Sequence, residues 1–249
     1  MIRFVVFGDN RSGSHFLQSL LHSHPAINCY WDIFWARDET PLGFRNYCSK
    51  VPARGILGLF AKRILIRDFL YRHFAGQYAK RGDKPGDVGA TGFLLKYGAA
   101  QRHPSILKWL RANGVRIIHI VRMNHLNHEI AFALRRSGVV ESHARIPIEF
   151  RPVRLETVNL VKRLDGMQEQ LEKMRKKIVG CETLEIKYED LLANLEGEVS
   201  RILTFLNVAA SAPLQSKFYK TESENPQEML ENYDEVRKAL SGTRYETYL

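Results

Sequence analysis

The sequence predicts an α/β fold: a single domain with a central, mainly parallel sheet flanked by helices. Short apolar segments alternate with longer segments of helical periodicity along most of the 249 residues, and such alternation produces parallel strands joined by right-handed crossovers. The hydrophobic share of 45% and the charged share of 26% are typical of a globular protein with one sizeable core. We therefore expect one domain over residues 1–249, with a basic helical insertion at about 51–85.

The first element is a buried strand at residues 2–7, because this segment is short and almost continuously apolar. A polar loop with Gly and Ser follows at residues 8–14. A helical stripe of Phe16, Leu17, Leu20 and Leu21 comes next, and His24-Pro25 ends it. This strand, loop and helix form the opening unit of a parallel fold.

The following segments are less regular. Residues 26–50 show no clean period, whereas 51–81 mix apolar residues with seven Lys or Arg against one acid, Asp68. That pattern predicts a basic amphipathic helix or helix pair, followed by a turn at 82–87.

The rest of the chain alternates again. Strands are predicted at residues 88–97, 115–121 and 183–187. Helices are predicted at residues 104–113, 124–137, about 155–178, 189–193, 196–206 and near 226–240, with an irregular basic segment at 138–154. In parallel sheets, ligands bind beyond the carboxyl ends of the strands. The segments Gly8–Ser14, Arg122–Asn124 and Tyr188–Asp190 all follow strands, so we expect them at one rim.

The loop after the first strand has the chemistry of an anion site. A helix N-terminus presents backbone N–H groups and the positive end of a dipole. Gly13 allows close approach of the backbone, while Arg11, Ser12 and Ser14 add charge and donors. An ordinary strand-to-helix turn with a serine N-cap is the alternative.

A nucleoside-triphosphate loop is a poorer fit. The spacing of Gly8 and Gly13 agrees with that motif, but Ser14-His15 stands where Lys-Ser or Lys-Thr is needed. The strand at 115–121 is followed by Arg122 and not by a magnesium-binding aspartate. A metal-free donor with fewer phosphates fits better than ATP.

Four pieces of the sequence, in order, resemble the sulfotransferase superfamily, closest to its bacterial carbohydrate- and lipid-modifying branch. They are Gly8-Asp9-Asn10-Arg11-Ser12-Gly13-Ser14-His15-Phe16-Leu17, Val121-Arg122-Met123-Asn124-His125-Leu126, Tyr188-Glu189-Asp190-Leu191-Leu192, and Asn232-Tyr233-Asp234-Glu235-Val236. The resemblance implies a P-loop-like phosphosulfate loop and the donor 3′-phosphoadenosine 5′-phosphosulfate (PAPS). It implies transfer of a sulfuryl group to a hydroxyl or amine of a carbohydrate, lipid or small molecule.

The resemblance also implies roles for single residues. Arg11, Ser12, Gly13, Ser14, His15 and Phe16 are expected to hold the 5′-phosphosulfate. Arg122 is expected to pair with the 3′-phosphate, where a planar guanidinium suits the oxygens, and Tyr188 to line the adenine pocket.

The sequence departs from the family at two places. A serine is usual eight or nine residues after the arginine, where Ile130 and Ala131 stand here. Either Arg135 or Arg136 replaces that ligand, or the 3′-phosphate is held weakly. Thr or Ser would also be more usual than His15.

A sulfuryl acceptor needs a general base, typically His, Asp or Glu. Asp32 is the first candidate, because some bacterial relatives place a carboxylate about twenty residues beyond the loop. Its rivals are His125 and His128 beside Arg122, whereas His119, within a strand, is expected to be a core residue. Lys96 either supplies positive charge to the sulfate that is transferred or is a surface lysine. Arg11, Asp32 and His125 are thus the candidate catalytic residues, with no metal site expected.

The net charge of +10 indicates a polyanionic partner. Solubility is the alternative explanation, and the charge alone does not choose among a nucleotide, a nucleic acid and an anionic membrane surface. A kinase-like nucleotide-binding protein or a non-catalytic nucleotide- or nucleic-acid-binding member remains an alternative function. No nucleic-acid motif is present. The basic segment 51–81 is either a lid over the acceptor or a contact with anionic membrane. Three dispersed cysteines and the lack of a visible signal peptide or membrane span predict a cytoplasmic location, with a membrane association left open.

Overall fold

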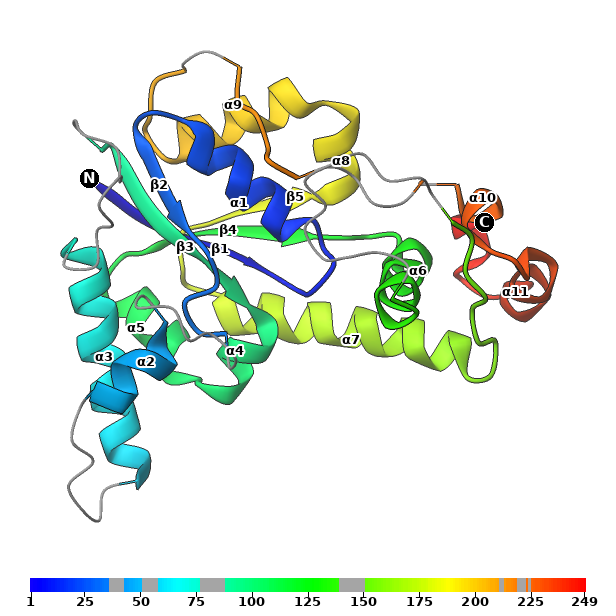
Figure 1. Ribbon diagram of the computed structural model, residues 1–249, viewed down its shortest axis with the longest axis horizontal. Coiled ribbons are helices and arrows are strands. Elements are labelled where there is room, and N and C mark those ends of the chain that lie inside the picture. Colours follow the sequence, from blue (N-terminus) through cyan, green and yellow to red (C-terminus); the bar gives the residue numbers. More distant parts are fainter. Residues whose placement is uncertain are drawn as a thin grey trace.

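In the computed structural model the chain forms one parallel sheet of five strands with helices on both faces (Figure 1). The structure describes residues 1–35, 43–50, 58–76, 88–138, 151–210, 213–218, 223 and 225–249. The strands, in the spatial order β2-β3-β1-β4-β5, are all paired in parallel. They are β1 (Ile2–Gly8), β2 (Ile27–Tyr30), β3 (Ala90–Lys96), β4 (Arg116–Val121) and β5 (Thr183–Lys187). The predicted fold class is confirmed.

Helices α1–α7 lie between successive strands in the chain, and α8–α11 follow the last strand, β5. They are α1 (Ser14–Ser23), α2 (Phe44–Lys50), α3 (Gly58–Phe74), α4 (Tyr97–Arg102), α5 (Ser105–Ala112), α6 (His125–Arg136), α7 (Leu160–Ile178), α8 (Tyr188–Ala193), α9 (Leu195–Phe205), α10 (Pro226–Met229) and α11 (Tyr233–Leu240), with a short 3₁₀ turn at Glu246–Tyr248.

The alternation of side chains along β1 divides the core between the two faces of the sheet. Val5 and Phe7 pack with α3, α5 and α7, whereas Phe4 and Val6 pack with α1, α8 and α9. Each strand residue points to the face opposite its neighbour, so a strand buried on both faces is apolar throughout. This is why residues 2–7 are continuously apolar.

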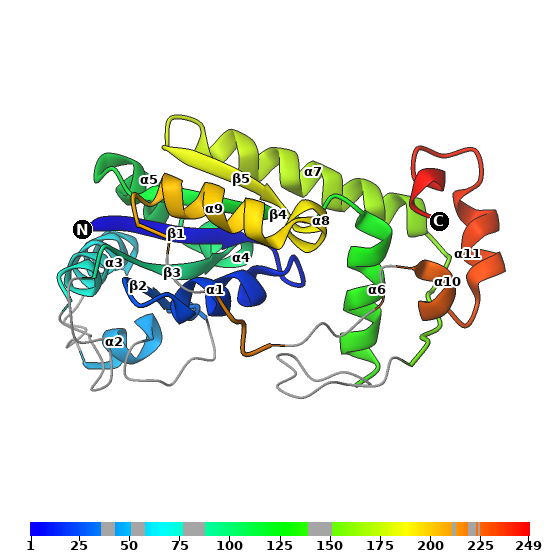
Figure 2. The same cartoon turned by 90° about the horizontal axis from the view of Figure 1, so that it is seen from above.

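A third cluster lies beyond the carboxyl ends of the strands. It joins α6 and the N-terminal end of α7 to α10 and α11 through buried residues such as Leu134, Leu164 and Val236. Figure 2 shows α6 standing across this end of the sheet, with the C-terminal helices beside it. Helix α6, packed against α7, α10 and α11, therefore borders the carboxyl ends of the strands on one side.

Several predicted boundaries were wrong. The elements β2, α2 and α4 were not predicted, and α7 begins at Leu160 and not near 155. Residues 153–155 instead pair with the C-terminal region: Val153 forms a parallel bridge with Leu230, and Leu155 exchanges two hydrogen bonds with the Asn232 side chain. The predicted helix at 226–240 is interrupted and forms α10 and α11.

The basic segment is helical where it is described. Helix α3 buries Ile66, Phe69 and Leu70 and exposes residues such as Lys62 and Arg67. Because Ile64 and Tyr71 are exposed as well, the apolar and basic residues are not separated on two faces, and the prediction of an amphipathic helix was wrong. The predicted turn at 82–87, most of the basic segment 138–154, and residues 51–57 and 77–81 of the insertion lie outside the described residues.

Candidate functional site

The loop between β1 and α1 has a backbone shape that requires glycine at one position. Arg11 and Gly13 both have positive φ angles, 61° and 80°, in the left-handed region that favours glycine. A Cβ atom added to Gly13 would overlap the ring of Tyr188. Gly13 therefore lets the loop pass directly over this aromatic side chain at the start of α1.

Lys96 lies under the loop at the end of β3. The parallel register places Lys96 beside Gly8 of β1, and its side chain is only 7% exposed. Its Nζ donates to the Asp9 carbonyl at 3.1 Å and also contacts the Ser14 hydroxyl. Burial lowers the Lys96 pKa to about 8, against the nearby charges of Asp32 and Asp9, which raise it. Lys96 is thus a buried cation facing the loop and not a surface lysine.

Two further side chains hold the loop backbone from the α6 side. Nε2 of His128 lies 2.6 Å from the Asn10 carbonyl, and Nη1 of Arg122 donates to the Arg11 carbonyl at 3.3 Å. Both side chains are buried, at 4% and 3% exposure. The loop is therefore attached to β3 on one side and to the β4–α6 junction on the other.

Arg122 and Tyr188 meet at the predicted rim. The guanidinium of Arg122 lies over the Tyr188 ring, 4.9 Å from its centroid, in cation–π geometry. The same junction is closed by the Asn124 N–H, which donates to Glu189 at 2.8 Å. The structure thus brings together the segments predicted from positions 8–14, 122–124 and 188–190.

Asp32 lies in the turn after β2 and is half-buried. Its Oδ1 accepts from the Phe34 N–H at 3.1 Å, which fixes the turn. Its charge is the first of those that raise the Lys96 pKa, so Asp32 stands on the loop side of the molecule. Beside it, the exposed Trp31 ring packs on His15 with centroids 5.2 Å apart.

The histidines named in the sequence occupy different environments. His119 is fully buried: its Nε2 lies 2.5 Å from the Tyr97 hydroxyl and its Nδ1 3.2 Å from Glu185. This agrees with the expected core role. His125 points toward α7, where its Nε2 lies 2.8 Å from Gln168 Oε1. Burial lowers the pKa of His125.

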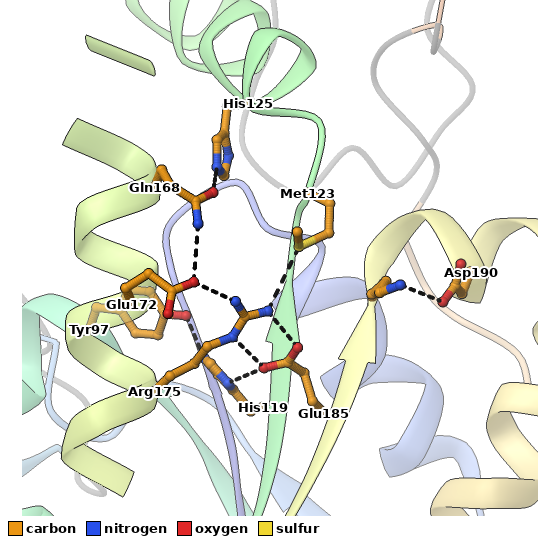
Figure 3. Close-up of polar contacts among 10 residues, drawn as sticks. Tyr97, His119, Met123, His125, Gln168, Glu172, Arg175, Glu185 and Asp190 are labelled. Atoms are coloured by element: carbon orange, nitrogen blue, oxygen red, sulfur yellow. Dashed lines mark hydrogen bonds and ion pairs between the residues drawn. The ribbon is translucent and has the colours of Figure 1, made fainter. Parts of the chain in front are cut away.

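One chain of polar contacts, drawn in Figure 3, runs from Tyr97 through His119 and Glu185 and ends at His125. From Glu185 the chain continues through Arg175, which binds that carboxylate with two nitrogens at 2.6 and 2.9 Å. It then passes through Glu172 and Gln168 to His125. Helix α7 is thereby fastened both to the sheet and to the start of α6.

The positions where a second 3′-phosphate ligand is usual face the core. Ile130 and Ala131 are buried, at 1% and 0% exposure. Arg136 donates to Glu129 at 3.0 Å, and Ser137 donates to the Leu134 carbonyl at 2.9 Å. Arg135 is exposed on α6.

Sequence reasoning missed the contribution of Asp9. Its Oδ2 accepts from Gln170 of α7 at 2.7 Å, and its Oδ1 accepts from the Asn10 N–H at 2.7 Å. Burial raises the Asp9 pKa, opposed by the Asn10 N–H and by the charge of Lys96. Asp9 and Gln170 are 161 residues apart, so no local pattern could have indicated their contact.

Within the described part of the chain, no group of three His, Cys, Asp or Glu side chains is arranged to hold a metal ion. In the same residues, no helix is long and apolar enough to cross a membrane.

Comparison by sequence finds no family that matches this chain and no curated protein that matches it. Comparison of structures gives sulfotransferases. The sulfotransferase domain of the Synechococcus PCC 7002 olefin synthase is 14% identical, with a TM-score of 0.51 over 98% of this chain and 88% of that chain. A sulfotransferase from Alicyclobacillus acidocaldarius is 16% identical over 89% of this chain and 87% of that chain, with a TM-score of 0.48.

The sulfotransferase domain from the curacin biosynthetic pathway is 14% identical over 100% of this chain and 83% of that chain, with a TM-score of 0.48. The likeness to the olefin synthase domain extends over almost the whole chain and shows that this protein has the sulfotransferase fold.

Proposed function

We propose that this protein is a sulfotransferase that moves a sulfuryl group from PAPS to a hydroxyl or amine. One observation carries the proposal: in a sulfotransferase fold, the loop Gly8–Ser14 lies at the strand ends with the buried cation Lys96 against it. A loop at a helix N-terminus attracts anions through its amides and its dipole. A buried amine at the same place favours an anionic group there.

The donor's 5′-phosphosulfate is assigned to the loop residues Arg11, Ser12, Gly13, Ser14, His15 and Phe16. Gly13 and the buried Lys96 fit such a group, because Gly13 allows the loop to adopt this backbone conformation against Tyr188 and Lys96 supplies positive charge close to the backbone. Arg122 is assigned to the 3′-phosphate and Tyr188 to the adenine, since the two side chains are stacked next to the loop.

The reaction proposed is an in-line displacement at sulfur. The acceptor oxygen forms a new S–O bond while the bond from sulfur to the 5′-phosphate oxygen breaks, and the electron pair stays on that phosphate. The transition state is loose, with charge on the equatorial and leaving oxygens. Lys96, Arg11 and the loop amides are proposed to stabilise this charge. The leaving group is a single phosphate, so the step as proposed uses no metal.

Asp32 is the proposed general base and takes the acceptor proton. It stands close enough to Lys96 for their charges to interact, and the exposed Trp31 beside it offers an aromatic face to the acceptor. His125 is kept as the second candidate. Its Nε2 contact with Gln168 points it toward α7, which favours Asp32.

The test is transfer of radiolabelled sulfate from PAPS to a panel of glycans, lipids and phenols. We expect labelled product from the native protein. The Asp32→Asn variant should lose about a hundredfold or more in turnover, the usual contribution of a general base, with unchanged affinity for adenosine 3′,5′-bisphosphate. His125→Asn is the comparison variant and should retain turnover within a few-fold. Failure of the native protein to bind PAPS or the bisphosphate would overturn the proposal.

We also propose a membrane role for the exposed side of α3. Lys62, Arg63 and Arg67 are exposed there next to the exposed apolar side chains Ile64 and Tyr71, and a cluster of basic side chains is attracted to anionic membrane surfaces. Co-sedimentation with vesicles of phosphatidylcholine, with and without phosphatidylserine, tests this role. Pelleting that depends on phosphatidylserine supports it, whereas no pelleting leaves the helix as a lid over the acceptor.

A further inference from the structure

Three successive carbonyls of the loop are each held by a different element. The Asp9 carbonyl accepts from Lys96 of β3, the Asn10 carbonyl from His128 of α6, and the Arg11 carbonyl from Arg122 after β4. In a planar trans peptide, the C=O of one residue and the N–H of the next point in opposite directions. A side chain that holds one carbonyl therefore sets the direction of the following N–H.

His128 makes the shortest of these three contacts, 2.6 Å from Nε2 to the Asn10 oxygen. The side chain is 4% exposed, and its ring stacks on Phe132 with centroids 5.1 Å apart and planes at 22°. A carbonyl oxygen only accepts hydrogen bonds, so Nε2 must carry the proton. Packing on Phe132 and the hydrogen bond to Asn10 together fix the orientation of the ring.

We infer that His128 is a positioning residue of the anion loop, whose Nε2–H turns the Asn10 carbonyl inward and thereby directs the Arg11 N–H to the opposite side, toward the donor's 5′-phosphate. The inference rests on the proposed function, because it gives the loop its ligand. It goes further by assigning a role to a residue that does not itself touch the donor.

The charges around this position explain why a neutral donor is favoured. Arg122 and Lys96 both act on the His128 ring, and burial together with these charges lowers its pKa to about 3. A third buried cation here would be repelled by the other two. A neutral imidazole supplies the N–H without that cost, and its low pKa makes the ring a weak proton acceptor.

The test compares His128→Leu, which removes the donor, with His128→Gln, which keeps an N–H of similar reach. Phe132→Leu is the matched control, because it changes the packing of the ring but leaves the hydrogen bond. Each variant is titrated by calorimetry with adenosine 3′,5′-bisphosphate and with adenosine 3′-monophosphate, which lacks the 5′ group. Amide spectra of Arg11 and Ser12 are recorded without ligand.

We expect His128→Leu to bind the bisphosphate about tenfold more weakly. This is the effect of losing one hydrogen bond whose contribution lies at the upper end of the usual range. Affinity for the 3′-monophosphate should stay the same in every variant. His128→Gln and Phe132→Leu should bind both nucleotides within about twofold to threefold of the native protein. The Arg11 and Ser12 amide signals should move in His128→Leu and stay near their native positions in His128→Gln.

Equal binding of the bisphosphate by His128→Leu and the native protein would overturn the inference. So would equal losses for both nucleotides in His128→Leu and His128→Gln, which indicate a purely structural role. If the native protein binds neither nucleotide, the proposed function fails, and the amide signals then decide: unchanged signals in His128→Leu also reject the positioning role, and selective movement supports it.

Discussion

The loop Gly8–Ser14 and the segment Arg122–Arg136 lie at the same edge of the sheet, yet they are built in different ways. In the loop, successive carbonyls are held by side chains from β3, α6 and the end of β4, and a buried cation lies against it. In the segment after β4, Arg122 is the buried cation, while Ile130 and Ala131 face the core and Arg136 is paired with Glu129.

The difference indicates how this protein divides the work of holding its proposed donor. In the proposed complex the 5′ end would meet a preorganised backbone site, whereas the 3′ end would depend mainly on one guanidinium. Arg122 also donates to the Arg11 carbonyl. The proposed ligand of the 3′-phosphate is therefore hydrogen-bonded to the loop proposed to hold the 5′-phosphate. Changes in the loop should therefore cost more than changes along α6.

The largest effect is expected from Gly13→Ala. The added Cβ would overlap the Tyr188 ring, and the φ of 80° is strained for any other residue. We expect a loss of affinity for adenosine 3′,5′-bisphosphate of about a hundredfold or more, because local strain and displacement of the loop each cost on the order of 1–3 kcal/mol. Calorimetry measures it.

Gly242→Ala is the matched control for Gly13→Ala. Gly242 has a similar φ of 72°, but nothing lies within 4 Å of an added Cβ. Its affinity should equal that of the native protein. If Gly13→Ala binds adenosine 3′,5′-bisphosphate as tightly as the native protein does, the loop conformation is not needed for binding.

The next effect is expected from Lys96→Met, which removes the buried cation without changing the shape of the side chain strongly. Turnover should fall about a hundredfold, a typical loss when one preorganised electrostatic group is removed. Sulfate transfer at saturating donor measures it. Lys108→Met, a surface change on α5, should have no effect. Turnover within a few-fold of native in Lys96→Met would place the stabilising charge elsewhere.

The lowered Lys96 pKa gives two trends of opposite sign. Between pH 8 and the ordinary value of 10.5, the unfolded chain binds more protons at Lys96 than the folded protein, so this group makes the free energy of unfolding rise with pH. Donor affinity should fall over the same window, because the charged amine is lost. Native and Lys96→Met proteins titrated from pH 7 to 10 should differ in both slopes, and identical slopes would contradict the assignment.

Arg122→Lys tests the connection between the two ends. Lysine keeps the charge but loses the planar donor pair and the stacking on Tyr188. We expect adenosine 3′,5′-bisphosphate to bind about tenfold more weakly, as one charge-assisted hydrogen bond is lost. Adenosine 5′-monophosphate should also lose affinity, because the Arg11 carbonyl is released. Unchanged affinity for adenosine 5′-monophosphate would show that the loop and Arg122 act independently in binding the two phosphates.

The smallest effects are expected on the far turn of α6. Arg136 forms an ion pair with Glu129, so the affinity of Arg136→Ala for the bisphosphate should stay within about twofold of the native value. Arg135→Ala should weaken the bisphosphate by about twofold to fivefold, the size of one exposed ion pair. A larger loss in Arg136→Ala than in Arg135→Ala would identify Arg136 as the second 3′-phosphate ligand.

The two regions also differ in how well their sequences predicted them. The apolar run at 2–7, Gly13 and the helical stripe after it are local patterns, and they correctly predicted β1, the loop and α1. The strand ends correctly placed Arg122 and Tyr188 at one rim. In contrast, β2 has only the four residues Ile27–Tyr30, too short to show a period beside aromatic neighbours.

The remaining features of the site depend on contacts between distant residues. The inward direction of Lys96 follows from the register of β3 on β1, which the sequence does not encode locally. The contacts of His128 with Asn10 and of Asp9 with Gln170 join positions 118 and 161 residues apart. Residue type alone made His128 a candidate base, and only its contact with the Asn10 carbonyl supports the positioning role that we propose.

The most direct measurement is a crystal structure with adenosine 3′,5′-bisphosphate bound. We predict the 5′-phosphate within hydrogen-bond distance of the backbone amides of residues 11–15 and of Lys96 Nζ, with the 3′-phosphate at Arg122. A nucleotide bound away from the Gly8–Ser14 loop, or bound in the reverse orientation with its 3′-phosphate in that loop, would contradict the proposed donor site.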